Sequence, residues 1–193
     1  MRFFAKRRFG SLVRPELASA LRETLLVEKP NVLQSQALPV TLGSSDVVCV
    51  AQTGAGKTLI FLLPLLEQLA ASACSTQECH RPCAPSALVI APSRELAMQH
   101  FSVAEKLAEK LPRPPEVMLC PAIKPPRSAE CSLSSLMIAQ PEHILARVAD
   151  GSLDTTHLRT VAIDEADAVL CAGPYEERLS AQGETSPLDS CNS

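Results

Sequence analysis

One glycine-rich loop constrains the fold of this 193-residue chain more than any other feature of its sequence. The loop, residues 51–58 (AQTGAGKT), follows a short apolar run at 46–50 that predicts a buried parallel strand. The residues from Lys57 to about Ala71 are mostly apolar and predict a helix whose N-terminus faces the loop. A strand, a glycine-rich loop and a helix in this order form a phosphate-binding site, because backbone N–H groups then surround the anion.

The residue types in this loop match the needs of a nucleotide's phosphates. Gly54 and Gly56 let the backbone turn and approach phosphate oxygens without a Cβ clash. Lys57 places a positive charge against the β- and γ-phosphates, and the Thr58 hydroxyl is the expected Mg²⁺ ligand. The general pattern has glycine where this chain has Ala51. The expected nucleotide contacts of the loop are Thr53, Gly54, Ala55, Gly56, Lys57 and Thr58.

A second motif lies much further along the chain, where the apolar run 160–163 ends at adjacent carboxylates. Asp164 is placed to hold Mg²⁺ directly or through a water, and Glu165 to orient and deprotonate the attacking water. Acids after a strand are often only a solvated turn, but the phosphate loop favours the catalytic interpretation. The predicted catalytic residues are Lys57, Asp164 and Glu165, and the predicted metal ligands are Thr58 and Asp164. These two motifs together predict a domain that binds and hydrolyses Mg–ATP.

The remaining pattern alternates strands with helices. Further strands are expected at 87–91, 117–120, 136–139 and 160–163. Ser93 can cap one helix that Pro112 ends, and a helix at 141–149 stops at Gly151. This alternation predicts an α/β fold with a mostly parallel sheet flanked by helices, with ligands at the carboxyl edge of the sheet.

Composition limits the partners and the compartment. A net charge of −3 excludes a chain that binds nucleic acid through overall basicity, so any such contact must be local. No apolar run is long enough for a membrane span, so no membrane partner is expected. The eight cysteines lack a disulfide spacing and favour an intracellular chain, with a zinc site at Cys74, Cys79, His80 and Cys83 as a minor alternative. Cytoplasm or nucleus is expected, and the basic residues 1–15 leave a mitochondrion or plastid open.

The four residues 164–167 (DEAD) resemble the signature of the DEAD-box RNA helicases, superfamily 2 proteins with two RecA-like domains. Residues 29–34 resemble the Q motif of this family, and by that resemblance Gln34 recognises adenine. One amide has the donor and the acceptor that this task needs. Phe9 matches the family's isolated upstream aromatic, which packs beside the adenine. The resemblance covers roughly residues 9–179 and implies ATP and Mg²⁺ as cofactors and RNA as a partner.

Two further segments resemble the RNA-binding motifs of this family. Residues 92–97 (PSRELA) look like motif Ia, and residues 140–143 (QPEH) stand where motif Ib usually reads Thr-Pro-Gly-Arg. The implied RNA contacts are Pro92, Ser93, Arg94, Glu95, Gln140, Pro141 and His143. Glu142 replaces a glycine and repels a phosphate backbone, while His143 is a weaker cation than arginine at pH 7. We therefore expect weak RNA binding.

Other positions also depart from the family pattern. Val27 stands where an aromatic residue usually stacks on adenine, and Asn31 stands where a hydroxyl residue is usual. Residues 121–126 replace a Gly-Gly element. The Ser-Ala-Thr motif III, its strand and the second RecA-like domain with its arginine finger have no counterpart in the sequence.

The resemblance thus implies a RecA-like P-loop domain that lacks the motif III strand, and we interpret the chain as truncated. In the family that strand lies between the strands expected at 46–50 and 160–163, so both should face a gap with unpaired backbone groups. The expected organisation is a basic flank at 1–8, an incomplete RecA-like domain at 9–179 and a disordered tail at 180–193.

Three functions remain open from the sequence. The first is the ATP-binding, RNA-dependent ATPase lobe of a DEAD-box helicase, which needs a second RecA-like lobe or a helicase partner. Alone it should turn over negligibly and not unwind RNA, because an arginine finger is worth about 10³–10⁵ in rate. The second is a non-catalytic truncated lobe that binds nucleotide, RNA or a partner. The third is a P-loop DNA translocase or another nucleotide hydrolase, against which Gln34 predicts adenine selectivity.

Overall fold

The computed structural model describes residues 8–43, 45–72, 84–120 and 136–171. The expected disordered tail, the cysteine and histidine cluster of residues 74–83 and the segment 121–126 lie outside these described residues. None of the helices in the described ranges combines the length and the apolar character that crossing a bilayer requires.

The described residues form a four-stranded sheet whose paired strands are all parallel, which confirms the predicted sheet type. Its strands are β1 Ala87–Ile90, β2 Val117–Leu119, β3 Leu136–Ala139 and β4 Thr160–Ile163, in the spatial order β2-β3-β1-β4. β1 and β3 are short apolar runs that are almost entirely buried, as expected for strands covered on both faces, whereas β4 leaves Val161 and Ile163 partly exposed. β3 and β4 have the predicted bounds, and β1 and β2 end one residue earlier than predicted.

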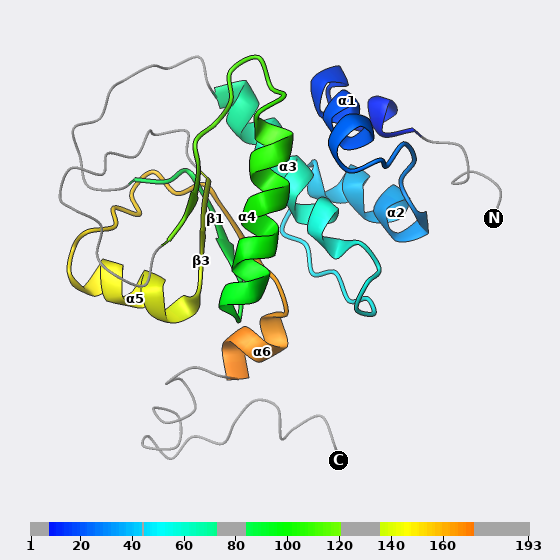
Figure 1. The fold of residues 1–193 in the computed structure, drawn as a ribbon. Coiled ribbons are helices and arrows are strands. Elements are labelled where there is room, and N and C mark those ends of the chain that lie inside the picture. Colours follow the sequence, from blue (N-terminus) through cyan, green and yellow to red (C-terminus); the bar gives the residue numbers. More distant parts are fainter. Residues whose placement is uncertain (1–7, 44, 73–83, 121–135, 172–193) are drawn as a thin grey trace, which may run out of the picture.

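Helices cover both faces of this sheet (Figure 1). They are the 3₁₀-helix η1 Phe9–Ser11 and the α-helices α1 Pro15–Thr24, α2 Val32–Thr41, α3 Lys57–Ser72, α4 Arg94–Ala108, α5 Pro141–Ala149 and α6 Ala166–Cys171. Successive strand residues alternate between two cores: Ala87 and Val89 face the large core that α1–α4 build, while Leu88 faces a smaller core that includes Ile144 of α5. The result is a three-layer α/β fold.

Local signals account for the ends of the helices. The Ser93 hydroxyl accepts a hydrogen bond from the Leu96 N–H at 3.3 Å and caps α4, as predicted. Pro141 starts α5, and Gly151 follows its end with a φ of +71°. Arg14, just before α1, pairs with Glu67 of α3 (Nε–Oε2 2.8 Å), which ties the N-terminal helices to the helix that follows the glycine-rich loop.

The prediction of a strand at residues 46–50 is wrong, because these residues form no strand in the structure. Val48 and Val50 are each 92% exposed. The physical reason is pairing: a strand forms only against a neighbour, and in the described part of the chain β4 pairs with β1 alone. Residues 46–50 and β4 instead line one groove of about 1170 Å³. In the part of the chain that the structure describes, no strand occupies the gap expected beside β4.

The position of β4 at the edge of the sheet predicts its hydrogen exchange. β3 is paired on both sides, so its amides should be better protected than those of β4. In peptides of the intact chain analysed by mass spectrometry, residues 160–163 should exchange at least about tenfold faster than residues 136–139. β3 serves as the internal control. Equal protection of the two segments would contradict the edge position.

Candidate functional site

The glycine-rich loop turns through two backbone conformations that favour glycine. Gly54 has a φ of +76° and Gly56 a φ of +80°. A Cβ on Gly56 would also lie 2.6 Å from Nε2 of Gln34 and 3.1 Å from Nδ2 of Asn31, so any side chain there would displace both amides. Ala51 does not have a positive φ, so alanine is accommodated where the general pattern has glycine.

Two side-chain amides from the start of α2 hold this loop. Gln34 Nε2 donates to the Gly56 carbonyl at 3.1 Å, and Asn31 Nδ2 donates to the Ala55 carbonyl at 2.9 Å. The same two residues form a capping box, in which each side-chain oxygen accepts the other's backbone N–H, at 2.8 and 3.0 Å. Asn31, which the sequence marks only as a departure, is thus a structural link between α2 and the loop.

Lys57 is the first residue of α3 and folds across its own loop. Its Nζ donates to the Ala51 carbonyl at 2.8 Å. A flexible stem and a compact ammonium let lysine exchange such a partner for a phosphate oxygen without moving the backbone. The loop is therefore closed by a bond that a phosphate can replace.

Asp164 and Glu165 follow β4 at the carboxyl edge of the sheet. The Asp164 backbone N–H donates to the Ile90 carbonyl of β1 at 3.0 Å. This bond attaches the Asp164–Glu165 turn to the end of β1. The Asp164 carboxylate accepts two hydrogen bonds, from the Glu165 N–H to Oδ1 at 3.0 Å and from His100 Nε2 to Oδ2 at 2.9 Å. Glu165 has a φ of +48°, a costly conformation for a residue with a side chain that is often found at functional sites.

The charge state of Asp164 follows from these contacts. The hydrogen bond from His100 holds the pKa of the Asp164 carboxyl below its ordinary value, against the opposing effect of burial. The charges of His100 and Lys57 and the backbone N–H of Glu165 lower the pKa further. Asp164 is therefore ionised at neutral pH, as a metal ligand must be.

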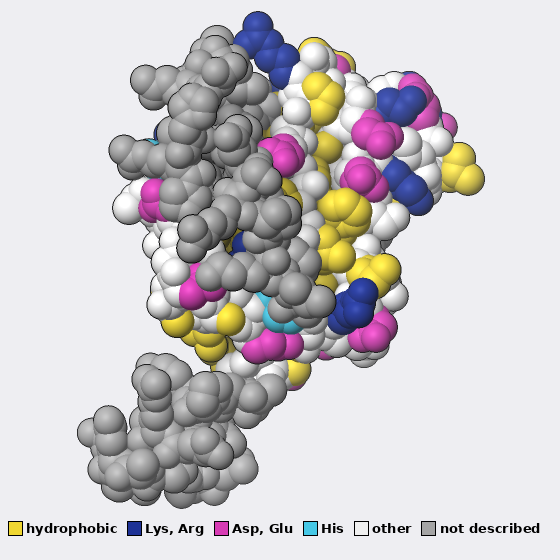
Figure 2. Space-filling model, turned by 60° about the vertical axis from the view of Figure 1, so that its left-hand side comes forward, with side chains coloured by type: hydrophobic (Ala, Val, Ile, Leu, Met, Phe, Trp, Pro, Cys, Tyr) yellow, Lys and Arg dark blue, Asp and Glu magenta, His cyan; other side chains and the backbone are white. Residues whose placement is uncertain are grey.

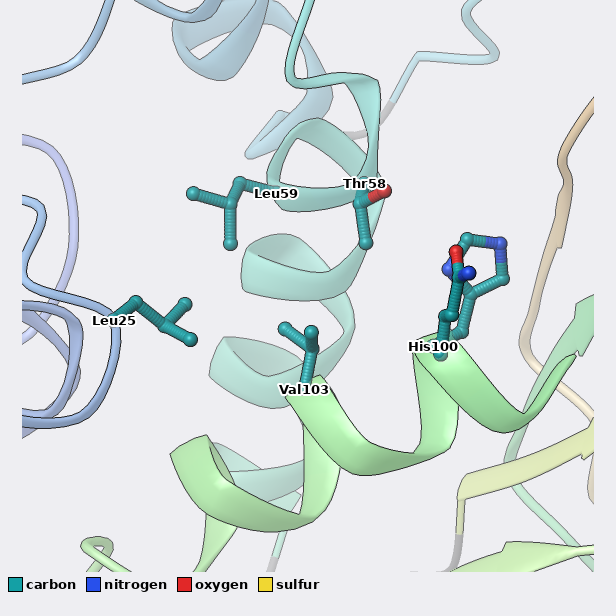
Figure 3. Close-up of a pocket in the computed structure, with 6 residues that line it drawn as sticks. Leu25, Thr58, Leu59, His100 and Val103 are labelled. Atoms are coloured by element: carbon teal, nitrogen blue, oxygen red, sulfur yellow. The ribbon is translucent and has the colours of Figure 1, made fainter. Parts of the chain in front are cut away.

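The groove beside β4 brings the two predicted motifs together. It is lined by Gln52, Thr53 and Lys57 from the loop and by Asp164 and Glu165 from the end of β4. Thr58 does not line this groove. It lines a neighbouring cleft of about 190 Å³ between α3 and α4, together with His100 and Leu25 (Figure 3).

The donor set suits a hard cation. Carboxylate and hydroxyl oxygens are the protein ligands that Mg²⁺ accepts, usually one or two of them, with water and phosphate oxygens completing the shell. Asp164 is ionised and partly buried in the groove, and Thr58, on the first turn of α3, lines the neighbouring cleft that His100 also borders. These two residues fit the protein's share of a Mg²⁺ site.

Phe9 lies in the large hydrophobic core. Phe9 is 1% exposed and packs in the large core with Leu17 and Leu38, and it lines neither the groove nor the cleft. Val27 is half-buried and packs against the same core. A contact between Phe9 and adenine stays a prediction, and the packing of the ring is sufficient to explain an aromatic residue at this position.

The predicted RNA contacts meet at the same sheet edge. β1 and β3 are adjacent and parallel, with Ile90 opposite Ala139, so the starts of α4 and α5 lie side by side. Arg94 and Glu95 are exposed on α4, while the other five residues are half-buried: Pro92, Ser93, Gln140, Pro141 and His143. On the described surface in Figure 2, basic and acidic side chains are interspersed, which agrees with local rather than general attraction for a polyanion.

Sequence reasoning missed His100. It is 3% exposed on the buried face of α4, between Ala97 and Ala104, and bonds to Asp164 from that helix. Its ring meets Phe61 of α3 edge to face, with centroids 5.3 Å apart. The sequence does show that His100 is a polar residue at an apolar position of the helical pattern. It does not show which residue is the hydrogen-bond partner of His100.

Comparisons with known proteins agree with this architecture. Residues 31–182 match the family model described as DEAD/DEAH box helicase. The chain is 36% identical over 160 residues to DEAD-box ATP-dependent RNA helicase 16 of Arabidopsis thaliana, covering 79% of this chain and 25% of that protein. It is 35% identical over 163 residues to the ATP-dependent RNA helicase dbp9 of Schizosaccharomyces pombe, covering 83% and 27%. The chain thus spans about a quarter of the length of these relatives.

Solved structures extend the likeness to the fold. The helicase Prp28 from Chaetomium thermophilum, bound to ADP, matches with a TM-score of 0.68 and 28% identity over 94% of this chain and 42% of its own. Dbp5 of S. cerevisiae, bound to RNA and ADP BeF3, matches with a TM-score of 0.68 and 23% identity over 86% and 40%, which concerns the fold alone. The RecA-like fold predicted from the sequence is confirmed, and the chain belongs to the DEAD/DEAH box helicase family.

Proposed function

We propose that this chain is the nucleotide-binding lobe of a DEAD-box RNA helicase, with ATP and Mg²⁺ as cofactors and RNA-stimulated ATP hydrolysis as its reaction. The observation that carries the proposal is the shared groove, in which Lys57 of the loop and the Asp164–Glu165 pair line one cavity. Hydrolysis of a bound triphosphate needs a cation for the phosphates, an ionised metal ligand and a base for water within one site.

Each residue has a definite task in this proposal. The Lys57 ammonium leaves the Ala51 carbonyl and donates to a phosphate oxygen instead. The backbone N–H groups of residues 53–57 donate hydrogen bonds to further phosphate oxygens. Thr58 and Asp164 hold Mg²⁺, which neutralises charge on the phosphates when bound. Glu165 orients the attacking water and accepts its proton. Gln34 reads the adenine edge and, because it also bonds to the Gly56 carbonyl, links recognition of the base to the phosphate loop.

The names of related proteins support RNA contact and cooperation with other proteins in this proposal. Dbp5 has been solved with RNA and ADP BeF3, and also with Gle1. In this chain RNA would lie along the starts of α4 and α5, where Glu142 opposes it and keeps affinity low. A second RecA-like lobe, in this or another chain, would supply the arginine finger. ATP and RNA are intracellular, so the cytoplasm or nucleus is the proposed location.

A non-catalytic lobe is the second candidate function. The open groove favours it, because Val48 and Val50 on one side and the exposed edge of β4 on the other offer a site for a partner rather than a closed active site. In this alternative the chain binds nucleotide, RNA or a helicase partner without turnover.

Gln34 tests whether the site recognises adenine. Gln34→Ala removes an amide that bonds to the loop and that is expected to read the base, so ATP affinity should fall by about 1–2 kcal/mol, roughly five- to thirtyfold. The preference for ATP over GTP should disappear. Calorimetric titration with both nucleotides measures this, and Gln36→Ala, an exposed glutamine on the same helix, is the matched control. Equal ATP and GTP affinity in the unaltered chain would instead favour another class of P-loop hydrolase.

Glu165 tests whether the site is catalytic. Glu165→Gln keeps the size of the side chain but removes the base, so RNA-stimulated phosphate release should fall by about 10²–10⁴ while ATP binding is retained. Phosphate release under single-turnover conditions is the measurement, because turnover by this chain alone should be slow without an arginine finger.

Glu105→Gln is the control for Glu165, since Glu105 is an exposed glutamate on α4 that lines neither the groove nor the cleft. It should leave phosphate release unchanged. Identical release from the Glu165→Gln variant and the unaltered chain would exclude hydrolysis by Glu165 and support the non-catalytic lobe.

A further inference from the structure

A hydrogen bond that the proposed mechanism does not use joins α4 to the proposed metal ligand Asp164. His100 Nε2 lies 2.9 Å from Asp164 Oδ2, and both groups are largely shielded from water, with side chains 4% and 12% exposed. An ionised carboxylate only accepts hydrogen bonds, so the hydrogen between them belongs to Nε2 of His100. A hydrogen bond of ordinary length that is shielded from water and made to a candidate metal ligand is a more specific contact than core packing.

The contact completes the restraint of the Asp164 carboxylate. Oδ1 accepts from the Glu165 N–H at 3.0 Å, so each of the two oxygens is held by one donor. A carboxylate bound at both oxygens cannot rotate about its terminal torsion without breaking one bond. Each oxygen still has a lone pair free for a metal ion or a metal-bound water.

His100 is itself held in place. Its ring packs edge to face against Phe61, with an interplanar angle of 89°, and the small residues Ala97 and Ala104 flank it on the buried face of α4. The ring also borders the cleft that Thr58 lines from α3 (Figure 3). His100 therefore stands next to both proposed protein ligands of the metal, bonding to one and bordering the cleft of the other.

We propose that His100 is a positioning residue of the metal site, which fixes the Asp164 carboxylate in the orientation that Mg²⁺–nucleotide binding requires. Hydrogen-bond partners of metal ligands set ligand orientation, and their loss typically costs 10–100-fold in metal affinity. The inference rests on the proposed function, because Asp164 is a metal ligand only there. The helix α4 carries predicted RNA contacts at its start. By this inference it also contributes to the proposed ATP site through His100.

Two substitutions at this position separate the hydrogen bond from the packing. His100→Phe keeps an aromatic ring against Phe61 but has no donor, whereas His100→Gln places an amide N–H at a reach similar to that of Nε2. Gln99→Ala is the matched control, because Gln99 borders the same cleft and makes no bond to Asp164. Thermal unfolding followed by circular dichroism verifies that each variant is folded.

The measurement is the affinity of the intact chain for ATP as a function of free Mg²⁺, with a parallel titration in EDTA. We expect His100→Phe to raise the Mg²⁺ concentration for half-maximal ATP binding by about 10–100-fold, with no change in EDTA. His100→Gln should restore the midpoint to within about threefold, and Gln99→Ala should not move it. A merely structural role would lower thermal stability in His100→Phe without shifting the Mg²⁺ midpoint.

The outcomes distinguish this inference from the proposed function. If the unaltered chain shows Mg²⁺-dependent ATP binding but His100→Phe leaves the Mg²⁺ midpoint in place, the role of His100 is refuted and the proposed function stands. If His100→Phe weakens binding equally with Mg²⁺ and in EDTA, His100 acts on the fold and not on the metal ligand. If the unaltered chain binds ATP at no Mg²⁺ concentration, both proposals fail.

Discussion

The parallel register of β1 with its two neighbours determines where the proposed RNA contacts and the Asp164–Glu165 turn lie. Ile90 is opposite Ala139 of β3 on one side and Ile163 of β4 on the other, so three strands end at the same height. The chain then continues into the start of α4, the start of α5 and the Asp164–Glu165 turn. In a parallel sheet all carboxyl ends lie at one edge. Segments that are distant in the sequence therefore become neighbours through strand pairing alone. A register slip of one residue would exchange the two faces of a strand and separate these groups.

Local chemistry made most of this fold predictable. The segments that form β1, β3 and β4 are continuous and mainly apolar. Ser93 caps the start of α4, and Gly151 follows the end of α5. Gly54 and Gly56 adopt the positive φ that a phosphate loop needs. These signals reside in a few adjacent residues, so they can be read without knowing the rest of the molecule. The strand expected at 46–50 failed because the same apolar pattern acquires strand geometry only from a neighbour, and pairing is a property of the sheet.

Some features of the site follow from the local sequence, whereas others depend on contacts between distant segments. Lys57 and the acids after β4 were predictable because their chemistry follows from spacing next to a strand or a glycine-rich turn. The amide bonds from Asn31 and Gln34 to the loop, and the bond from His100 to Asp164, join segments that are far apart in the chain. A polar residue at a buried helix position indicates that some partner exists, because burial without one costs about 1–3 kcal/mol, but it does not identify the partner.

These tertiary bonds also connect different helices to the two parts of the proposed site. The phosphate loop is tied to α2 through two amides, whereas the proposed metal ligand is tied to α4 through His100. The start of α4 carries the residues that resemble an RNA-binding motif, and its middle holds one oxygen of Asp164 while the strand–helix turn holds the other. A rigid helix that shifts at one end must shift at His100 as well, and the Asp164 carboxylate then either follows or loses a bond. His100 thus joins α4, which carries the proposed RNA contacts at its start, to the proposed metal ligand Asp164.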